Sequence, residues 1–451
     1  MTRREALGLA WGAGRRRPNI VLVLADDLGW ADLGVNGADL HETPQLDRLA
    51  REGVQFRQAY APSPVCTPTR ASILTGKHPA RLGMTIWHEA AAAPARDRRM
   101  LGAASEPNLA LGEKTLAECL REAGYGTALV GKWHLGTGGH SPEAQGFDIN
   151  IGGTHWGAPP SFFAPYRGLF NRELRFVPGL EAAPAGEYLT DRLTEEAIGV
   201  MDRFRARRQP FFLYLAHHAP HTPIEAKQEL VRKYERKLRA GLRHTNAVYA
   251  AMVESLDESV GRIEEYLRAK GLAGNTVIVF SSDNGGYLEG QGGRVTSNEP
   301  LRSGKGSLYE GGIRVPLLVK GPGMKPGIVK RPVMLTDLFP TLLEMAGARG
   351  PAGVRDGRHL FAGKPREALH WHYPHYYPTT TPVGALREGR WKLLEYFEDG
   401  RLELFDLEAD EGEREDLAER MGQRARAMRA RLEAWRKEVG ARMPSRNPAV
   451  V

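Results

Sequence analysis

The sequence predicts an α/β protein built on a large, mostly parallel sheet with helices on both faces, followed by a smaller α+β region. Up to about residue 360, short apolar runs alternate with helical patterns, which is typical of parallel strands buried on both sides. Polar residues follow four of these runs and precede a fifth. Because ligands bind beyond the carboxyl ends of parallel strands, the residues after each run indicate where a site would lie.

The first run, residues 19–24, is followed by the adjacent carboxylates Asp26 and Asp27. Two neighbouring carboxylates repel each other unless a cation neutralises them, and hard oxygen ligands suit Ca²⁺ or Mg²⁺. The alternative is that the pair caps the next element. A helix with Pro44 in its first turn is expected over residues 43–49.

One of the two cysteines, Cys66, stands directly before an expected helix start in the segment C-T-P-T-R. The nearby Arg70 cation predicts that Cys66 ionises readily to a thiolate. The alternative is a buried structural cysteine, which is the common role of a lone cysteine. Cys119 lies on the apolar side of a helix expected over residues 116–123, so we expect it in the core. Both are expected as thiols, because a bridge between them would consume Cys66.

The second and third runs lead into basic and imidazole side chains. Residues 127–130 precede Lys132 and His134, which project to the same side of an extended chain. A cation and an imidazole placed so could hold an oxyanion and shuttle a proton; the alternatives are a solvated lysine and a core histidine. Residues 211–216 precede three histidines, of which His221 is followed by T-P. Their spacing is not that of a helical zinc motif, so one histidine aimed at a leaving group is favoured over zinc.

The fourth run, residues 276–280, ends close to Asp283 and Asn284, which offer oxygen ligands next to two glycines. The alternative is an ordinary Asn-Gly turn. Before the fifth run, residues 315–319, a loop rich in Gly and Ser carries Lys305 and could bind an oxyanion. It lacks the order of a P-loop. An apolar stripe at helical spacing over residues 248–267 predicts a packed helix that stops at Gly271.

The pattern changes from about Arg366. Residues 370–377 are dense in aromatic and imidazole groups, which either close the mouth of a site or pack a domain interface. Asp399 and Gly400 predict a hairpin between strands over residues 390–397 and 402–406. A last amphipathic helix is expected from the apolar positions between Leu417 and Trp435.

The composition is that of a globular protein of 451 residues with a formal net charge of +8, which suits an anionic substrate. We expect the arginine-rich stretches 203–208 and 420–436 to be solvated helix faces, and no nucleic-acid-binding motif is present. No apolar span reaches the length of a transmembrane helix. Residues 1–10 are similar to the start of a twin-arginine export signal with a short apolar stretch, which predicts a periplasmic or exported protein if it works and a cytoplasmic one otherwise.

Six motifs occur in one order: the Asp26–Asp27 pair, C-x-P-x-R, G-K-W-H-x-G, H-x-P, D-N-G-G and G-K-G-x-x-x-E-G-G. Together they resemble the type I sulfatase set of the alkaline phosphatase-like superfamily, from about residue 18 to the end. The chain is similar to bacterial arylsulfatases and N-acetylgalactosamine sulfatase-like exo-sulfatases. The resemblance implies an N-terminal tail or remnant signal over residues 1–17, a catalytic domain over 18–365 and a smaller α+β domain over 366–451.

The resemblance also implies the site. A formylglycine-generating or anaerobic maturation enzyme would oxidise Cys66 to formylglycine, whose hydrated aldehyde is the nucleophile. Ca²⁺, favoured over Mg²⁺, would be bound by formylglycine at position 66 together with Asp26, Asp27, Asp283 and Asn284. Arg70 and Lys132 would hold the formylglycine, and His134 would act on its hydroxyl. His221 and Lys305 would bind the sulfate and the bridging oxygen.

The implied reaction is hydrolysis of sulfate monoesters. Residues 187–191 and the H-T-P-I run look similar to those of bacterial exo-sulfatases, a resemblance that implies exo action on galactose or N-acetylgalactosamine sugars. Candidate substrate contacts are His155, Trp156 and His372, with aromatic packing as the alternative. Two rival functions are a phosphonate or phosphate ester hydrolase of the same superfamily and a non-catalytic protein that binds sulfated glycans with Cys66 unconverted.

Overall fold

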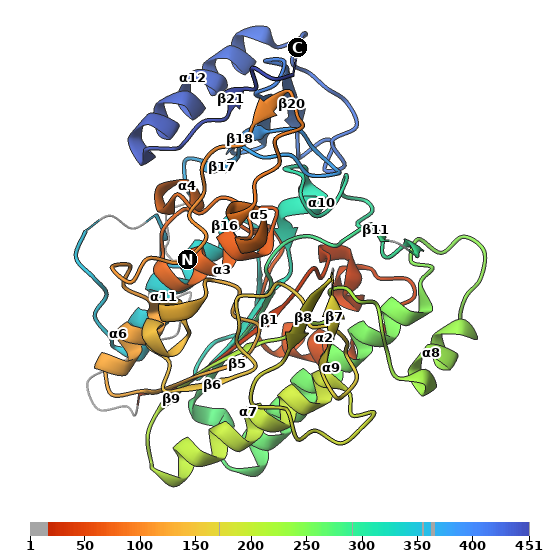
Figure 1. Cartoon of the computed structure of the whole chain (residues 1–451), viewed down its shortest axis with the longest axis vertical. Helices are drawn as coiled ribbons and strands as arrows, with labels where there is room; N and C mark the ends of the chain where they lie inside the picture. The colour runs from red at the N-terminus through yellow and green to blue at the C-terminus, as the bar shows by residue number, and fades with distance from the viewer. Residues whose placement is uncertain (1–16, 171, 291, 354–355, 362–365, 451) are drawn as a thin grey trace.

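The computed structural model describes residues 17–450 except 171, 291, 354–355 and 362–365. The export signal expected within residues 1–17 therefore lies outside the described residues, apart from Arg17. A large α/β body carries a small C-terminal layer of strands and one long helix at one end (Figure 1).

The body is organised around an eight-stranded sheet with β1 (Asn19–Ala25) near its middle. β1 pairs in parallel with β9 (Phe211–Ala216) and β10 (Thr276–Ser282), and β9 pairs in parallel with β5 (Gly126–Gly131). The fifth apolar run forms β14 (Leu317–Lys320), which lies antiparallel to β10. The remaining strands of the sheet are β2 (Val54–Phe56), β6 (Ile149–Ile151) and β15 (Gly327–Val329). The predicted mostly parallel sheet is confirmed.

Side chains of β1 alternate between two cores, one on each face of the sheet. Val21, Val23 and Ala25 pack in the first core, whereas Ile20, Leu22 and Leu24 pack in the second. The helices of the first core are α2 (Pro44–Glu52), α7 (Leu189–Ala206), α8 (Gln228–Glu235) and α9 (Ala247–Ala269). Those of the second are α3 (Cys66–Thr75), α6 (Leu116–Glu122) and α11 (Leu338–Ala346).

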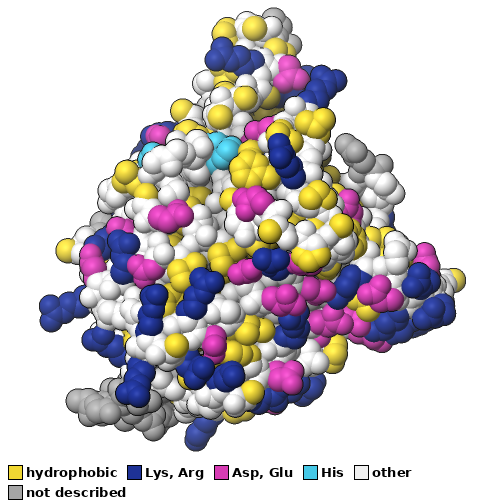
Figure 2. Space-filling model, turned by 60° about the horizontal axis from the view of Figure 1, so that its bottom comes forward, with side chains coloured by type: hydrophobic (Ala, Val, Ile, Leu, Met, Phe, Trp, Pro, Cys, Tyr) yellow, Lys and Arg dark blue, Asp and Glu magenta, His cyan; other side chains and the backbone are white. Residues whose placement is uncertain are grey.

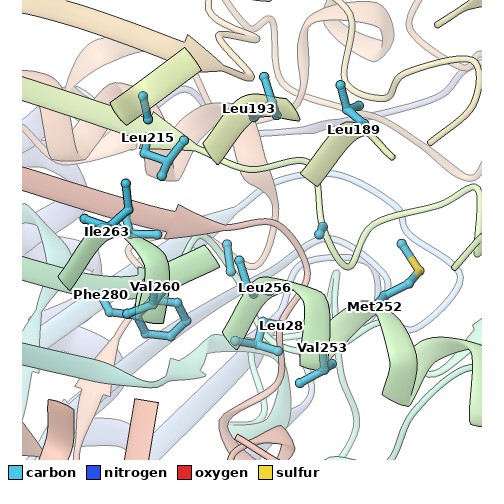
Figure 3. Packing of buried hydrophobic residues seen from close by; sticks show 14 of the residues in the cluster. Leu28, Leu189, Leu193, Leu215, Met252, Val253, Leu256, Val260, Ile263 and Phe280 are labelled. Atoms are coloured by element: carbon cyan, nitrogen blue, oxygen red, sulfur yellow. The ribbon is translucent and has the colours of Figure 1, made fainter. Parts of the chain in front are cut away.

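α9 carries the apolar stripe that was expected over residues 248–267. Leu256, Val260 and Ile263 are buried, and Figure 3 shows them on the side of the helix that faces Phe280 of β10. The helix ends at Ala269, and Gly271 follows with a φ of 67°, a left-handed conformation in which glycine is not strained. Both parts of the prediction are confirmed.

The C-terminal sheet is antiparallel and consists of β17 (Leu369–Tyr373), β18 (Val383–Glu388), β19 (Trp391–Tyr396) and β20 (Leu402–Asp406). The expected hairpin at Asp399 and Gly400 joins β19 to β20, and Gly400 has a φ of 76°. α12 (Gly422–Val439) packs on one face of this sheet through Met428 and Leu432. The other face, which includes Trp371, packs against the body.

The charged surface agrees only in part with the expectation of solvated arginines. Arg436 of α12 is buried and its Nη2 lies 2.6 Å from an oxygen of Glu395, so the prediction is wrong there: the helix packs this position onto the sheet. Figure 2 shows Lys and Arg mixed with Asp and Glu over one face of the molecule. Within the described part of the chain, none of the helices combines the length and the apolar character needed to span a bilayer.

Candidate active site

The carboxyl ends of the central strands bring the predicted polar residues together. Ala25 of β1 is in register with Ser282 of β10, so Asp26 and Asp27 leave the sheet beside Asp283 and Asn284. Gly131 of β5 is likewise in register with Ala216 of β9, which places Lys132 next to the histidine segment. Segments far apart in the sequence thus meet at one edge, as parallel pairing predicts.

Two residues of this edge have left-handed backbones without being glycine. Asp27 has a φ of 63° and His134 a φ of 59°. Such conformations cost free energy and persist where the surroundings hold them, which is common at functional sites. Here they turn the two side chains towards a shared cavity that both line.

Cys66 is the first residue of α3, whose residues are all buried. Its side chain lines the cavity although the residue is only 4% exposed. Burial raises the pKa of the Cys66 thiol, and the nearby carboxylates of Asp26 and Asp283 act in the same direction. The expected thiolate is therefore wrong, because burial outweighs the attraction of the neighbouring cations. The residue is a protonated thiol held in the site.

Two carboxylates lie close to this thiol, and two more oxygen-bearing side chains adjoin them. Ligand atoms of Asp26, Cys66 and Asp283 all lie within 4.8 Å of one another. Asp26 Oδ1 and Asn284 Oδ1 are buried and accept no hydrogen bond. Burial, reinforced by the Asp26 carboxylate, raises the pKa of Asp283 to about 6. Hard oxygen atoms without partners, in a cluster where negative charge is unfavourable, fit a divalent cation.

Each carboxylate also has a cationic neighbour. Lys132 Nζ lies 2.6 Å from Asp26 Oδ2, and Lys305 Nζ lies 2.7 Å from Asp27 Oδ2. Arg70 donates to Asp283 Oδ2 from Nε at 2.8 Å and donates to the Lys132 carbonyl from Nη1 at 3.1 Å. The site therefore presents positive groups for an anion beside oxygen ligands for a metal.

Of the three histidines after β9, only His221 lines the cavity within the described structure. Its Nδ1–H donates to the Thr222 carbonyl at 2.8 Å, which leaves Nε2 at 3.5 Å from Asp27 Oδ2. Burial and the Lys305 charge lower the pKa of His221 to about 3. His217 instead contacts Ser259 at 2.9 Å, and burial lowers the pKa of His218. This arrangement differs from a zinc cluster.

The cavity has a volume of about 320 Å³. Its floor combines Asp27, Cys66, His134, His221 and Lys305. Its wall contains four aromatic residues, Trp87, Phe170, Tyr287 and Tyr377, and two charged ones, Glu89 and Arg175. A charged floor under aromatic walls suits a ligand that has an anionic end and a ring-shaped body.

The three predicted substrate contacts do not line this cavity. His155 and Trp156 lie next to it in the chain: Gly157 and Ala158 line it, while Trp156 Nε1 donates to Glu173 at 2.9 Å. His372 is buried on the face of β17 that turns towards the C-terminal segment, and its Nε2–H donates to the Arg442 carbonyl at 2.8 Å. The alternation of side chains along β17 places His372 away from the site, because Trp371 takes the face towards the body.

The aromatic segment 370–377 packs the domain interface, as one of its two expected roles predicts, and also contributes one residue to the cavity. Trp371 packs between the C-terminal sheet and the body and donates to the Ala61 carbonyl at 2.8 Å. Tyr377, beyond the end of β17, reaches the cavity wall.

Sequence reasoning missed Glu89 and Arg175. Glu89 lies on α5 (His88–Ala92), and its Oε2 is 2.9 Å from His134 Nε2. Arg175 belongs to the hairpin of β7 (Arg167–Phe170) and β8 (Glu173–Phe176), and its Nη2 lies 2.9 Å from Glu173 Oε2. Neither stands in a motif or after a predicted strand, so no local signal pointed to them.

Comparisons with known proteins agree with this geometry. Residues 18–348 match the family model named Sulfatase, and residues 304–438 match the one described as N-sulphoglucosamine sulphohydrolase, C-terminal. N-acetylgalactosamine-6-sulfatase of Mus musculus is 37% identical over 372 residues, covering 79% of this chain and 68% of that enzyme. A sulfatase of Formosa agariphila is 33% identical and covers 93% of this chain and 89% of its own length.

Among solved structures, Ps i-CgsB in complex with k-i-k-neocarrahexaose is similar with a TM-score of 0.77 at 31% identity. The similarity covers 96% of this chain and 95% of that one. The first family match contains every residue of the cavity floor. The chain therefore belongs to the sulfatase family, has the alkaline phosphatase-like fold and is a sulfuric ester hydrolase.

Proposed function

We propose that the chain removes sulfate from galactose- or N-acetylgalactosamine-type sugars at a chain end, with Cys66 converted to formylglycine and a Ca²⁺ ion bound. The observation that carries this proposal is the cluster of Asp26, Asp27, Asp283 and Asn284 around Cys66. Two of its oxygens, Asp26 Oδ1 and Asn284 Oδ1, accept no hydrogen bond from the described part of the protein, and buried cations lie next to the cluster.

Asp26, Asp27, Asp283 and Asn284 would hold the metal together with the side chain at position 66. Ca²⁺ accepts several oxygen ligands in flexible geometry, which suits three carboxylates and an amide better than the strict octahedron of Mg²⁺. The ion would neutralise the sulfate oxygens that otherwise repel a nucleophile. Formylglycine would supply two hydroxyl groups on one carbon, one for attack on sulfur and one for release of sulfate.

The surrounding side chains have distinct tasks in this reaction. Arg70 and Lys132 stabilise negative charge around position 66, since both are fully buried and positioned by Asp26 and Asp283. The Asp27 carboxylate, against the effect of burial, holds the pKa of Lys305 well above its usual value. Lys305 thus stays protonated and can neutralise the bridging oxygen. His221 is neutral beside Asp27, and a bound sulfate ester would favour its protonated form.

The shape of the cavity supports a single sugar unit as the recognised body. A volume of about 320 Å³ is at the small end of ligand pockets, and aromatic walls can stack on the apolar face of a ring. Two relatives bear names that fit a sulfated sugar, N-acetylgalactosamine-6-sulfatase and the i-CgsB complex with neocarrahexaose. A small pocket lined by charged residues favours action on a terminal residue.

The proposal is tested with protein produced together with a maturation enzyme and supplied with Ca²⁺. We expect sulfate release from 6-sulfated galactose and N-acetylgalactosamine, and from oligosaccharides only at the terminal residue. For aryl esters, kcat/KM should be at least about 100-fold higher for sulfate than for phosphate, a difference of about 2.7 kcal/mol. A preference for phosphate or phosphonate esters would support the rival hydrolase. Tight glycan binding without any turnover would support the binding protein.

A further inference from the structure

We propose that Glu89 is a positioning residue: it fixes His134 in the tautomer whose Nε2 carries the hydrogen, so that Nδ1 is the atom that accepts a proton. The use of that atom in sulfate release rests on the function proposed above. The tautomer itself follows from contacts within the protein.

One ring nitrogen of His134 is hydrogen-bonded and the other is not. Nε2 lies 2.9 Å from Glu89 Oε2, and an ionised carboxylate can only accept, so Nε2–H donates. Nδ1 is buried and has no hydrogen-bond partner. A neutral imidazole with a hydrogen on Nε2 has its free lone pair on Nδ1.

Glu89 also fixes the surface on which the imidazole ring rests. Its second oxygen, Oε1, accepts a hydrogen bond from Gly157 N at 3.1 Å. A Cβ at Gly157 would stand 2.6 Å from His134 Cε1, so only glycine allows this close approach to the ring. One carboxylate thus holds the edge of the ring directly and its face through Gly157.

The backbone of His134 is tied to the residue after the reacting position. Thr67 Oγ1 donates to the His134 carbonyl at 2.8 Å, and His134 N donates to the Thr154 carbonyl at 2.8 Å. These bonds hold the left-handed backbone of His134. Glu89 fixes the ring, so both the backbone and the side chain of His134 are held in place. His134 and Cys66 line the same cavity.

Of the groups with the largest effect on the pKa of His134, Glu89 is the one that favours proton uptake. Burial lowers the pKa of His134, and Lys132 and Arg70 lower it further, whereas Glu89 raises it. Although Glu89 is itself mostly buried, His134 and the Gly157 N–H keep the pKa of Glu89 below its usual value, so it stays ionised. Without this carboxylate, the imidazolium formed by proton uptake would lose its hydrogen-bonded anion, while Lys132 and Arg70 would still oppose the positive charge.

In the reaction, the proton of a hydroxyl group at position 66 passes to His134 Nδ1. The electron pair of that O–H bond forms the second carbon–oxygen bond of the aldehyde as the C–O bond to sulfate breaks, and the sulfate leaves with the pair of that broken bond. Glu89 takes no proton. It stabilises the positive charge on the imidazolium through the existing bond to Nε2.

The variant Glu89→Gln tests the proposal through the tautomer of His134, which would not change if Glu89 had only a structural role. Gly157 N–H requires an acceptor, so the amide oxygen stays there and the amide NH₂ turns to His134 Nε2. Because an NH₂ group donates, Nε2 must become the acceptor and the hydrogen moves to Nδ1. Imidazole ¹⁵N shifts in protein with unconverted Cys66 report this change without any turnover, and the His134→Asn variant identifies the signal.

We expect the Nε2–H form in the wild type, the Nδ1–H form in Glu89→Gln, and return of the Nε2–H form in Glu89→Asp. The matched control is Glu173→Gln, which removes a carboxylate beside the same Arg175 without touching His134 and should leave the tautomer unchanged. An unchanged tautomer in a folded Glu89→Gln protein would overturn the proposal.

The same variants in converted enzyme separate the two half-reactions. In Glu89→Gln we expect one rapid release of aryl alcohol per enzyme, followed by turnover about 10²–10⁴-fold slower than the wild type with KM nearly unchanged. Turnover within about threefold of the wild type would refute the positioning role. Absence of sulfate release from the wild type would instead refute the function proposed above. The ¹⁵N measurement would still test the tautomer of His134, because it does not depend on turnover.

Discussion

Two clusters of fully buried charges in this molecule look alike and serve different ends. In the active-site cluster, Lys132 Nζ lies 2.6 Å from Asp26. In what we call the interface cluster, formed by Tyr60, Glu310, Arg387, Lys392 and Glu413, Lys392 Nζ lies 2.9 Å from Glu310 and 2.8 Å from Glu413. Both clusters contain close ion pairs with almost no exposure to solvent.

The clusters differ in how close a cation lies to their oxygen atoms. Glu413 Oε1 of the interface cluster accepts no hydrogen bond but lies 2.8 Å from Lys392 Nζ, whereas Asp26 Oδ1 lies 3.9 Å from Arg70 Nη2. In the interface cluster, Tyr60 donates to Glu310 Oε2 at 2.7 Å, and Glu310 N donates to Glu413 Oε2 at 2.6 Å. In the active-site cluster, Asp26 Oδ1 and Asn284 Oδ1 accept nothing and the cluster opens to a cavity. Burial of charge therefore does not by itself mark a site here. Acceptor oxygens that lack both a hydrogen bond and a close cation, beside the cavity that Cys66 lines, do.

One sequence motif contributes a residue to each of the two clusters. G-K-G-x-x-x-E-G-G contains Lys305, which pairs with Asp27, and Glu310, which pairs with Lys392 of β19. The lysine serves the site, whereas the glutamate fastens the C-terminal sheet to the body. A shared motif thus carries one chemical and one structural residue.

The largest expected effect comes from the reacting position. Cys66→Ser should lose more than about 10³-fold in turnover, because serine offers one hydroxyl and no second one for release of sulfate. Turnover of an aryl sulfate and the intact mass of the protein measure the effect. Cys119→Ala, which alters the cysteine packed in the core, should keep its activity per folded molecule. Repeated turnover by Cys66→Ser would contradict the mechanism.

The next effect distinguishes the clusters by their response to metal. After chelation, added Ca²⁺ should raise the Tm by several degrees, since a ligand at 100 times its Kd adds about 2.7 kcal/mol of stability. Asp283→Asn should abolish this shift and lower activity by about 10²-fold or more. Lys392→Met should retain the shift. If it were instead lost in Lys392→Met and kept in Asp283→Asn, the unfilled oxygens would not be the metal ligands.

The interface cluster should respond in stability rather than in chemistry. Lys392→Met leaves Glu310 and Glu413 buried without their common cation, so we expect a loss of about 3–5 kcal/mol in unfolding free energy. Activity per folded molecule should change less than about threefold. Urea denaturation and kcat on the same preparation check both. Lys437→Met, which breaks an exposed pair with Glu433, is the control and should leave stability unchanged.

The last effect concerns Asp257, a buried carboxylate that is hydrogen-bonded but forms no ion pair with any described residue. It accepts from Gln45 N at 3.1 Å and Leu46 N at 2.7 Å, and burial raises its pKa to about 7. Since the folded pKa exceeds the unfolded one, the folded state binds more protons, and stability falls as pH rises from about 4 to about 7.

Asp257→Asn should remove the contribution of Asp257 to the pH dependence of the unfolding free energy, which is at most about 1.4 kcal/mol per pH unit. Urea midpoints between pH 4 and pH 8 measure it. An identical slope in wild type and variant would show that Asp257 does not titrate in this range.

The strands and their polar ends could be predicted because each is a local pattern. β9 has the bounds of its apolar run, and β10 extends the fourth run by two residues, since uninterrupted apolar segments buried on both faces have few alternatives. Parallel pairing then places Asp26, Lys132 and Asp283 together without further information. The site floor was therefore accessible from the sequence.

The walls of the site and the state of Cys66 were not accessible in this way. Glu89 reaches His134 from α5, and Arg175 reaches Glu89 from the β7–β8 hairpin, through packing that no nearby residue indicates. The raised pKa of Cys66 depends on the burial of the whole of α3, which a low-hydrophobicity segment such as C-T-P-T-R does not predict. The misplacement of His372 came from ignoring the alternation of faces along a strand.

The most direct test is the mass of the proteolytic peptide that contains Cys66, from protein made in its native host or with a maturation enzyme. We expect a peptide lighter by the change from thiol to aldehyde, which a hydrazide probe captures. An unmodified thiol in protein that hydrolyses sulfate esters would contradict the proposed nucleophile. The side chain at position 66 would then not be the formylglycine that we propose to bind the metal together with Asp26 and Asn284.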